Sequence, residues 1–251
     1  VVGGVEWVRA NQADPDIAKD TEKAKKQFAG GEILGKRLGI IGLGHIGVKV
    51  ANAALALGME VWAYTLLEGD GTIPGLAEGV RLLEGPEEIY QNCDYITLHL
   101  PLNDATRQMI DGAVFAQMKP GTVLLNFSRD KLVDDEALAQ AMEQGIVRRY
   151  VSDFPNPAVV HPPGALVIPH LGASTEESED NCACMAVDQL KAFLEEGTLR
   201  NAVNYPDCTL GAKTAGPRLC VLGENLEEDR LLAPWKVLAR AAARKGERCC
   251  L

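Results

Sequence analysis

The sequence predicts an α/β fold, a doubly wound parallel sheet with a partial second domain. Short apolar runs alternate along the chain with stretches of helical periodicity, which is the pattern of parallel strands joined by crossover helices. A glycine-rich turn links the first strand to its helix. The length of 251 residues allows one or two domains, and 47% hydrophobic with 24% charged residues is typical of a globular chain.

The first 28 residues are expected to form a surface arm that leads into the sheet. Lysine and glutamate recur at helical spacing from residue 14 to residue 28, and glycines then break the pattern. The apolar side chains of Val5, Trp7, Val8 and Ile17 fit an interface with a second subunit and simple packing equally well.

A strand, a turn, a helix and a second strand follow the arm. Residues 37–42 form an apolar strand, residues 45–57 carry apolar side chains on one helical face, and residues 59–64 form a second apolar run. This unit has the size, about 30 residues, of a right-handed parallel crossover.

The rest of the sheet is predicted from shorter signals. Four more strands are expected at residues 95–98, 122–125, 147–151 and 166–168. The largest intervening helix spans residues 134–144. It starts with acidic residues and stops before a glycine.

A capping signature at Ser174 and Thr175 predicts the start of a long helix, which is expected to stop at Gly197. We expect Cys182 and Cys184 to be buried in it as small apolar groups. Beyond it the signal weakens to a strand at residues 218–222 and a basic helical tail.

Charge and cysteine usage exclude several classes of protein. The net charge of -10 disfavours nucleic acid and anionic lipid as partners. No apolar run approaches the roughly 18 residues of a membrane span, and no signal peptide is evident, so we expect a cytoplasmic protein. Seven cysteines without a C-x-x-C pair predict neither a disulfide framework nor a metal site.

The glycine turn matches the G-x-G-x-x-G pattern between a strand and a helix. Gly42 permits a tight turn, Gly44 lets a pyrophosphate approach the backbone, and Gly47 brings helix and strand close together. His45 and Ile46 lie in the first helical turn, whose N–H groups attract an anion. The sequence therefore predicts a Rossmann-type dinucleotide-binding domain.

The residue at the end of the second strand sets the choice of dinucleotide. An acidic residue is expected there to bind the ribose 2′-hydroxyl, but the chain has Thr65. No basic residue follows to accept a 2′-phosphate, and Glu68 and Asp70 make the loop acidic. The predicted cofactor is therefore NAD rather than NADP.

Three further stretches carry a family resemblance. HLPL at residues 99–102, MKPGTVLLNFSR at residues 118–129 and PHLGAST at residues 169–175 resemble the D-isomer-specific 2-hydroxyacid dehydrogenases in order and spacing. The resemblance spans roughly residues 1–222. Residues 170–181 and 201–206 are most similar to the members that oxidise 3-phospho-D-glycerate with NAD in serine biosynthesis.

The resemblance implies a hydride-transfer site. His170 would be the general acid and base, because a base must take the hydroxyl proton while hydride leaves C2. Arg129, which follows a strand, would bind the substrate carboxylate in two-point fashion. The implied reaction converts 3-phospho-D-glycerate to 3-phosphooxypyruvate.

The resemblance also assigns cofactor-binding residues. Asp153 would bind the nicotinamide carboxamide, with Ser152 as a competing alignment. The other implied contacts are Phe127 and Ser128 at the nicotinamide ribose, Pro101 at the adenine, and Gly172.

One expected catalytic group is missing. The family supplies a Glu that bonds the histidine shortly after a D-x-F or D-F-P stretch, and this chain has Pro157 there. Another carboxylate would have to serve, with Asp130 and Glu176 nearest in sequence. Otherwise the histidine acts unaided or the chain is impaired.

The resemblance sets the expected domain boundaries. Residues 1–175 would form the NAD-binding domain with its arm, residues 176–206 a return helix and part of a substrate domain, and residues 207–251 the start of a regulatory domain and an irregular tail. A substrate-binding portion of roughly 100 residues is expected ahead of the chain. Residues 65–83 are unlike the family.

Two other functions stay open. A non-catalytic NAD-binding regulatory protein is favoured by Thr65 and Pro157. A hydroxypyruvate, glyoxylate or lactate dehydrogenase would share the motifs. The expected partners are a small-molecule 2-hydroxy acid and further copies of the chain, as a homodimer or a higher oligomer.

Overall fold

We describe a computed structural model of the chain. It covers residues 2–65, 73–203, 205, 207–209, 222–223 and 249–250. The chain divides into two units, Val1–His170 and Leu171–Leu251, and each is described separately.

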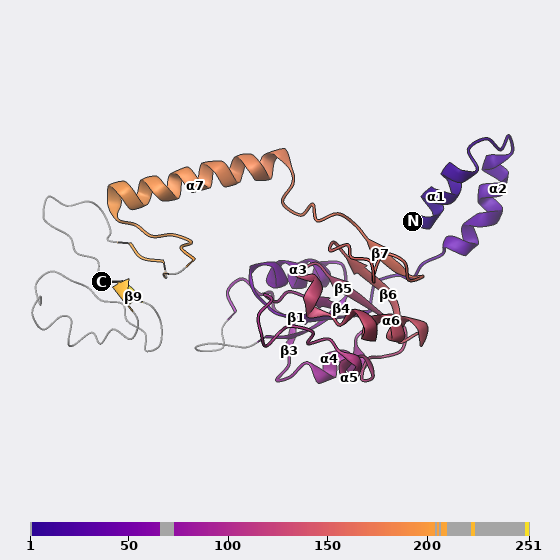
Figure 1. Cartoon of the computed structure of the whole chain (residues 1–251), viewed down its shortest axis with the longest axis horizontal. Helices are drawn as coiled ribbons and strands as arrows, with labels where there is room; N and C mark the ends of the chain where they lie inside the picture. The colour runs from indigo at the N-terminus through magenta and orange to yellow at the C-terminus, as the bar shows by residue number, and fades with distance from the viewer. Residues whose placement is uncertain are drawn as a thin grey trace, which may run out of the picture. The chain divides into compact units, whose positions relative to one another are not determined.

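The first unit is built on a seven-stranded sheet in the order β3-β2-β1-β4-β5-β6-β7 (Figure 1). Every neighbouring pair is parallel, as predicted. The strands are β1 (Arg37–Ile41), β2 (Glu60–Tyr64), β3 (Arg81–Leu82), β4 (Tyr95–Leu98), β5 (Thr122–Asn126), β6 (Val147–Ser152) and β7 (Ala165–Val167).

The central strands are buried over nearly their whole length, which explains their continuous apolar runs. In β1, Leu38 pairs with Val61 of β2 on one side and with Tyr95 of β4 on the other. The chain therefore moves outward from β1 in both directions. The gap between β1 and β4 is the switch point where open α/β sheets bind ligands.

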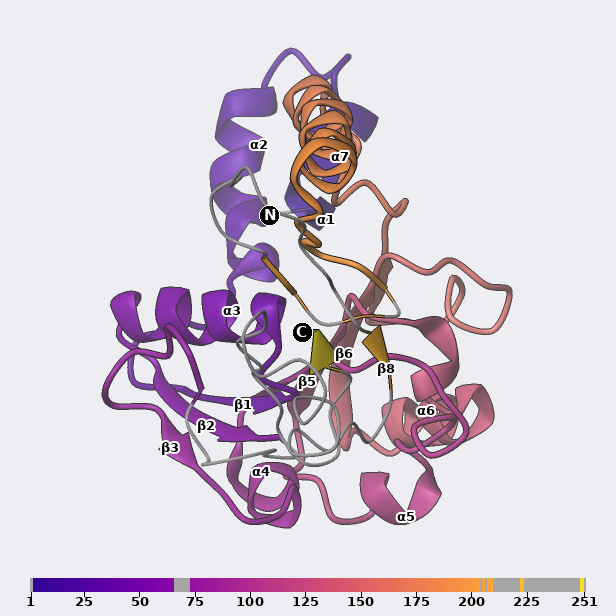
Figure 2. The same cartoon turned by 90° about the vertical axis from the view of Figure 1, so that its left-hand side faces the viewer.

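Helices cover both faces of the sheet, as Figure 2 shows for α3 on one side and α4 and α5 on the other. The helices are α3 (His45–Ala56), α4 (Glu87–Asn92), α5 (Gly112–Phe115) and α6 (Asp135–Glu143), with a 3-10 turn η2 (Asp130–Leu132). Val48, Ala51 and Ala54 of α3 pack on the first face. Ile89, Tyr90, Phe115, Leu138 and Ala141 pack on the second.

Local signals explain where these helices begin. Asp134 caps α6 by accepting a hydrogen bond from the N–H of Ala137 at 2.9 Å, so the acidic start predicted for this helix is confirmed. Asp111 caps α5 in the same way. β3, α4 and α5 were not predicted, because elements of two to six residues carry too little periodicity.

The arm contains two helices, α1 (Val2–Ala10) and α2 (Ile17–Ala24), followed by the 3-10 turn η1 (Lys25–Phe28). The sequence predicted only the second of these. The Trp7 and Phe28 rings pack 6.4 Å apart, whereas Val2, Val5 and Val8 are exposed. The arm therefore has little core of its own.

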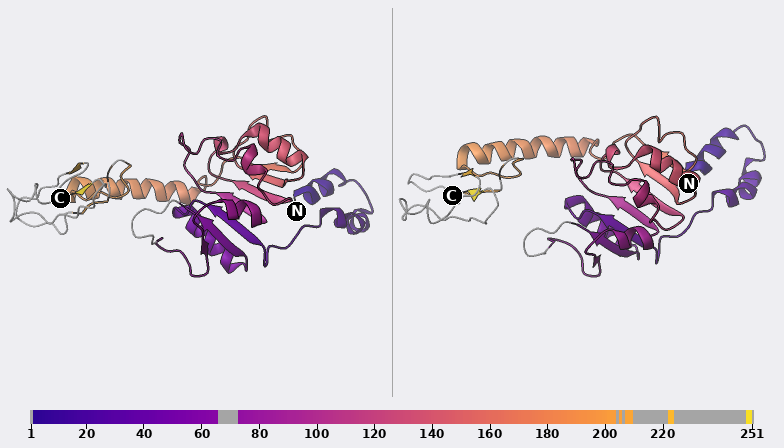
Figure 3. Two further views of the ribbon diagram at one scale, coloured as in Figure 1. Left: turned by 90° about the horizontal axis from the view of Figure 1, so that it is seen from below. Right: turned by 60° about the horizontal axis from the view of Figure 1, so that its bottom comes forward.

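The second unit begins with α7 (Glu176–Glu196), one continuous helix (Figure 3). Thr175 caps it by accepting from the N–H of Ser178, and Gly197 ends it at a positive φ of 71°, both as predicted. No residue of α7 is buried. The expected burial of Cys182 and Cys184 was wrong, since both are exposed.

Beyond α7 the structure describes short pieces of chain. Cys208, which pairs with Leu199 in a β-bridge, forms a disulfide bond that the cysteine spacing did not predict. β8 (Leu222–Gly223) pairs with β9 (Cys249–Cys250) in antiparallel fashion. The strand expected at residues 218–222 lies outside the described residues except for its last residue, and so does most of the basic tail. Among the described residues, no helix is both long and apolar enough to cross a membrane.

Candidate functional site

The glycine turn after β1 is held by contacts that only glycine permits. Gly42 has a φ of +101°, and a Cβ there would lie 2.4 Å from the carbonyl oxygen of His99. Its N–H donates to the carbonyl of Tyr64 at 2.8 Å. A Cβ on Gly47 would lie 2.0 Å from the carbonyl oxygen of Gly42. These contacts press the first turn of α3 against the end of β1.

The middle of the turn is open instead. A Cβ on Gly44 would meet no atom of the described residues within 4 Å, and Gly44, His45 and Ile46 are exposed. Gly44 is the N-cap of α3, so the free N–H groups and the positive end of the helix lie beside this open space. The turn can therefore receive an anionic group such as a pyrophosphate.

Thr65 comes directly after β2 and is half-buried. β2 is the neighbour of β1, so Thr65 lies at the same edge of the sheet as Gly42. Thr65 stands where an acidic residue was expected, and its hydroxyl is the polar group at that position. Glu68 and Asp70, which supported the preference for NAD, lie outside the described residues.

The ends of β4 and β5 contribute polar and aromatic groups beside the switch point. Ser128 donates its hydroxyl to the carbonyl of Leu98 at 2.6 Å, which ties the two strand ends together. Phe127 is 41% exposed, and Pro101 is exposed. Burial lowers the pKa of His99, whose Nε2 lies 3.1 Å from the Thr97 hydroxyl.

Arg129 is exposed at the end of β5. Its carbonyl accepts a hydrogen bond from the Asn126 side chain at 2.8 Å, which fixes the backbone of the turn. One guanidinium nitrogen donates to the carbonyl of Ser128 at 2.6 Å. In the described residues the guanidinium forms no ion pair, so its charge is available to an anionic ligand.

Asp153 and His170 meet at the carboxyl ends of β6 and β7. These strands are parallel neighbours, with Ser152 paired to Val167, so residues that follow them lie at one edge. Nδ1 of His170 lies 2.7 Å from Oδ2 of Asp153. The Phe154 ring lies 5.0 Å from the imidazole. The histidine side chain is 54% exposed, whereas the aspartate side chain is 8% exposed.

The carboxylate beside His170 is therefore neither of the two that the sequence suggested. Asp130 accepts from the N–H of Lys131, and Oδ2 of Asp130 lies 3.8 Å from Nζ of Lys131. Glu176 is exposed in the first turn of α7. Pro157, exposed in the turn after β6, has no group to offer the histidine. The sequence did not predict this pair, because the two residues meet only when β6 pairs with the three-residue strand β7.

Gly172 belongs to the second unit, where it is exposed and a Cβ would meet nothing within 4 Å. Its predicted contact with the cofactor stays a prediction.

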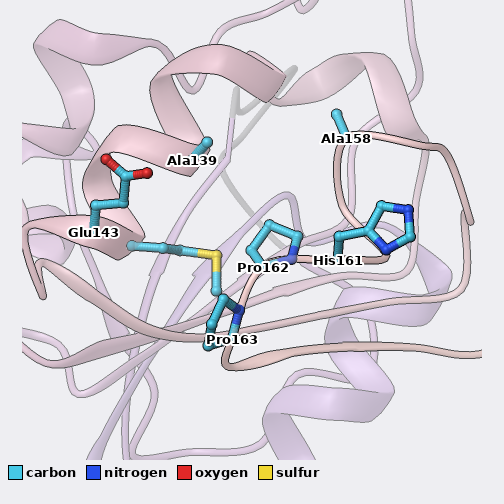
Figure 4. A pocket seen from close by; sticks show the side chains of 7 residues that line it. Ala139, Glu143, Ala158, His161, Pro162 and Pro163 are labelled. Atoms are coloured by element: carbon cyan, nitrogen blue, oxygen red, sulfur yellow. The ribbon is translucent and has the colours of Figure 1, made fainter.

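A separate pocket of about 510 Å³ lies between α6 and residues 158–163 (Figure 4). Ala139, Met142, Glu143, His161 and Pro162 line part of it. None of the predicted site residues faces it. With one carboxylate and one histidine among mostly apolar groups, it lacks the arginine and the glycine turn that the predicted chemistry requires.

The carboxyl edge of the sheet thus holds an open glycine turn that can receive an anion, an exposed arginine, and a histidine hydrogen-bonded to a buried carboxylate. The residues present fit a dinucleotide, because the open space at Gly44 is where a pyrophosphate approaches the backbone. Oδ1 of Asp153 is also buried, with no hydrogen-bond partner among the residues that the structure describes. A histidine that can accept a proton and an arginine that can bind a carboxylate are the two groups that oxidation of a hydroxy acid requires.

Comparison with known proteins matches residues 6–172 to the sequence model of the family described as D-isomer specific 2-hydroxyacid dehydrogenase, NAD binding domain. The chain is 34% identical to the D-3-phosphoglycerate dehydrogenase of Haemophilus influenzae over 206 residues, which cover 77% of this chain and 49% of the relative. It is 36% identical to the Methanocaldococcus jannaschii enzyme of the same name over 199 residues, 75% of this chain and 37% of the relative.

Among solved structures, a glyoxylate reductase from Paecilomyes thermophila superposes with a TM-score of 0.62 at 32% identity. The match covers 69% of this chain and 54% of the reductase. The chain spans about half the length, or less, of the relatives that it matches.

Proposed function

Because the chain belongs to the D-isomer-specific 2-hydroxyacid dehydrogenase family, we propose that it oxidises a D-2-hydroxy acid with NAD. The observation that carries the proposal is the Asp153–His170 pair at the same edge of the sheet as the Gly42–Gly47 turn. A glycine turn alone accounts for binding a dinucleotide. A histidine bonded to a carboxylate at that edge adds a proton acceptor.

The cofactor would be held along the switch point. Gly42, Gly44 and Gly47, with the first turn of α3 at His45 and Ile46, would bind the pyrophosphate. Further along, the proposed contacts are Thr65 at the adenosine ribose, Pro101 at the adenine, Phe127 and Ser128 at the nicotinamide ribose, Asp153 at the carboxamide, and Gly172. NAD would supply the hydride acceptor.

His170 and Arg129 would act on the substrate. Arg129 binds the carboxylate and polarises the C2 oxygen as a carbonyl forms. The proton of the C2 hydroxyl passes to Nε2 of His170, and the C2 hydrogen leaves with the electron pair of its bond as a hydride, which NAD would accept. The acid is thereby oxidised by two electrons to a 2-oxo acid, and in the reverse direction the same nitrogen returns the proton.

The substrate we favour is 3-phospho-D-glycerate, which would place the chain in serine biosynthesis. The support is the identity of 34% and 36% to two D-3-phosphoglycerate dehydrogenases, together with the motifs around residues 170–181. In the reverse direction, glyoxylate is the second candidate substrate, supported by the likeness at 32% identity to a glyoxylate reductase.

The predicted oligomer and domain boundaries remain proposals. Exposed valines on α1 and exposed apolar side chains on α7, such as Leu190 and Leu194, supply surface for a second copy. The boundaries at residues 175 and 206 are proposed from the family resemblance. The cytoplasmic location expected from the sequence also remains a proposal.

The proposed reaction is tested by following NADH formation with a panel of D- and L-2-hydroxy acids. The assay uses the longest product that the gene encodes, since the chain spans about half of its relatives. We expect turnover with the D isomer, highest with 3-phospho-D-glycerate. Preference for an L isomer would contradict the proposal, as would NADH formation that persists after Arg129→Ala and His170→Ala are combined.

A further inference from the structure

We infer that Asp153 is the positioning residue of His170 and does the work of the glutamate that Pro157 replaces. The inference deepens the proposed function and rests on it for the role of His170. It concerns which carboxylate orients the imidazole and through which atoms.

The contact with Asp153 determines which ring nitrogen of His170 carries the proton. An ionised carboxylate carries no proton, so Nδ1 of His170 is the donor in the 2.7 Å contact with Oδ2. The neutral ring is then held in its Nδ1–H tautomer, and Nε2 is left to accept a proton. When Nε2 takes the proton, the carboxylate stabilises the resulting imidazolium.

Burial distinguishes Asp153 from the other carboxylates of the sheet. Asp94, at the opposite edge, accepts hydrogen bonds from the N–H of Arg37 and from Nζ of Lys119. Asp153 is more deeply buried, its one hydrogen-bond partner in the described chain is His170, and its Oδ1 has none. Burying a carboxylate costs folding free energy unless the carboxylate is paired with a cation or a hydrogen-bond donor. This one is paired with a group that becomes positive during the proposed reaction.

The surrounding chain holds both partners. Ser152 accepts from the N–H of Phe154 at 3.1 Å through its hydroxyl, and from the N–H of Ile168 at 3.0 Å through its carbonyl. The first bond fixes the turn that contains Asp153, and the second joins it to the segment before His170. The Phe154 ring limits rotation of the imidazole from the side. A short aspartate directly after β6 therefore reaches the ring without the longer side chain of a glutamate.

The test reads the tautomer of His170 directly, by long-range ¹H–¹⁵N correlation spectra of the ¹⁵N-labelled chain without cofactor or substrate. The chain has four histidines, and His170→Gln identifies the signals. We expect the Nδ1–H tautomer in the wild type. In Asp153→Ala we expect a shift toward the Nε2–H form that a free ring favours. Asp153→Asn, which preserves the shape, should shift the ring partly, because an amide also donates.

Asp130→Ala is the matched control. Of the two carboxylates that the sequence suggested as partners of His170, Asp130 is the one that lies in unit Val1–His170. The variant should leave the His170 signals unchanged, and His161 serves as an internal reference in every spectrum. An Nε2–H tautomer in the wild type would overturn the inference, and so would an Nδ1–H tautomer that survives in both Asp153 variants. The readout needs no turnover, so it is independent of whether the dehydrogenase assay succeeds.

Discussion

Replacing Gly47 with alanine is expected to lower the free energy of unfolding by about 3 kcal/mol. The added methyl would lie 2.0 Å from the carbonyl oxygen of Gly42, a backbone atom that cannot rotate away. Helix α3 must then shift from the end of β1, which disturbs the packing of Val48 and Ala51 on the sheet. Chemical denaturation of the two proteins measures the difference.

Gly44→Ala is the matched control, because it adds the same methyl three residues earlier in the same turn. Within the part of the chain that the structure describes, that methyl meets nothing within 4 Å, and Gly44 has an ordinary φ of -76°. Stability should change by less than about 1 kcal/mol. The methyl would nevertheless occupy the open space beside the helix end, so we expect NADH to bind at least roughly tenfold more weakly. Equal stability losses in the two variants would contradict the packing described for the turn.

His170→Ala is expected to lower kcat by roughly 10²–10⁴-fold, the usual contribution of a positioned acid or base. The side chain is 54% exposed, so little packing is lost, but buried Asp153 loses its partner, and chemical denaturation of the variant therefore accompanies the kinetics. NADH binding should be nearly unchanged, because the histidine would act on the substrate rather than hold the cofactor. Steady-state kinetics together with a binding titration separates the two effects.

His161→Ala is the control for this experiment, since it removes an exposed histidine that lines the separate pocket beside α6. It should retain wild-type kcat. Arg129→Ala should instead raise KM for the hydroxy acid as well as lowering kcat, because the arginine would bind the substrate carboxylate. A His170→Ala enzyme with normal kcat would refute the assignment of His170 as the base.

The sheet was predictable because its central strands are continuously apolar and bounded by clear turns. β4 spans Tyr95–Leu98 as expected, and α3 begins at His45 directly after the glycine turn. α1 was not predicted, since its apolar side chains are scattered and half-exposed valines give little periodicity. Cys182 and Cys184 were placed wrongly because an amphipathic pattern cannot say whether a partner covers the apolar face.

The glycine turn was predictable to the residue, because backbone clashes at Gly42 and Gly47 leave no other amino acid. The partner of His170 was not. The motifs suggested Asp130 and Glu176, whereas the contact with Asp153 depends on β6 and β7 lying side by side. Such proximity follows from strand order, which no local pattern encodes.

We propose that the carboxyl edge of this sheet binds NAD. The most direct test is calorimetric titration of the purified chain with NADH and, separately, with NADPH. We expect binding of NADH and at least roughly tenfold weaker binding of NADPH, since the sequence has no Lys or Arg in residues 66–80 to accept a 2′-phosphate. Failure of a folded chain to bind either nucleotide would contradict it.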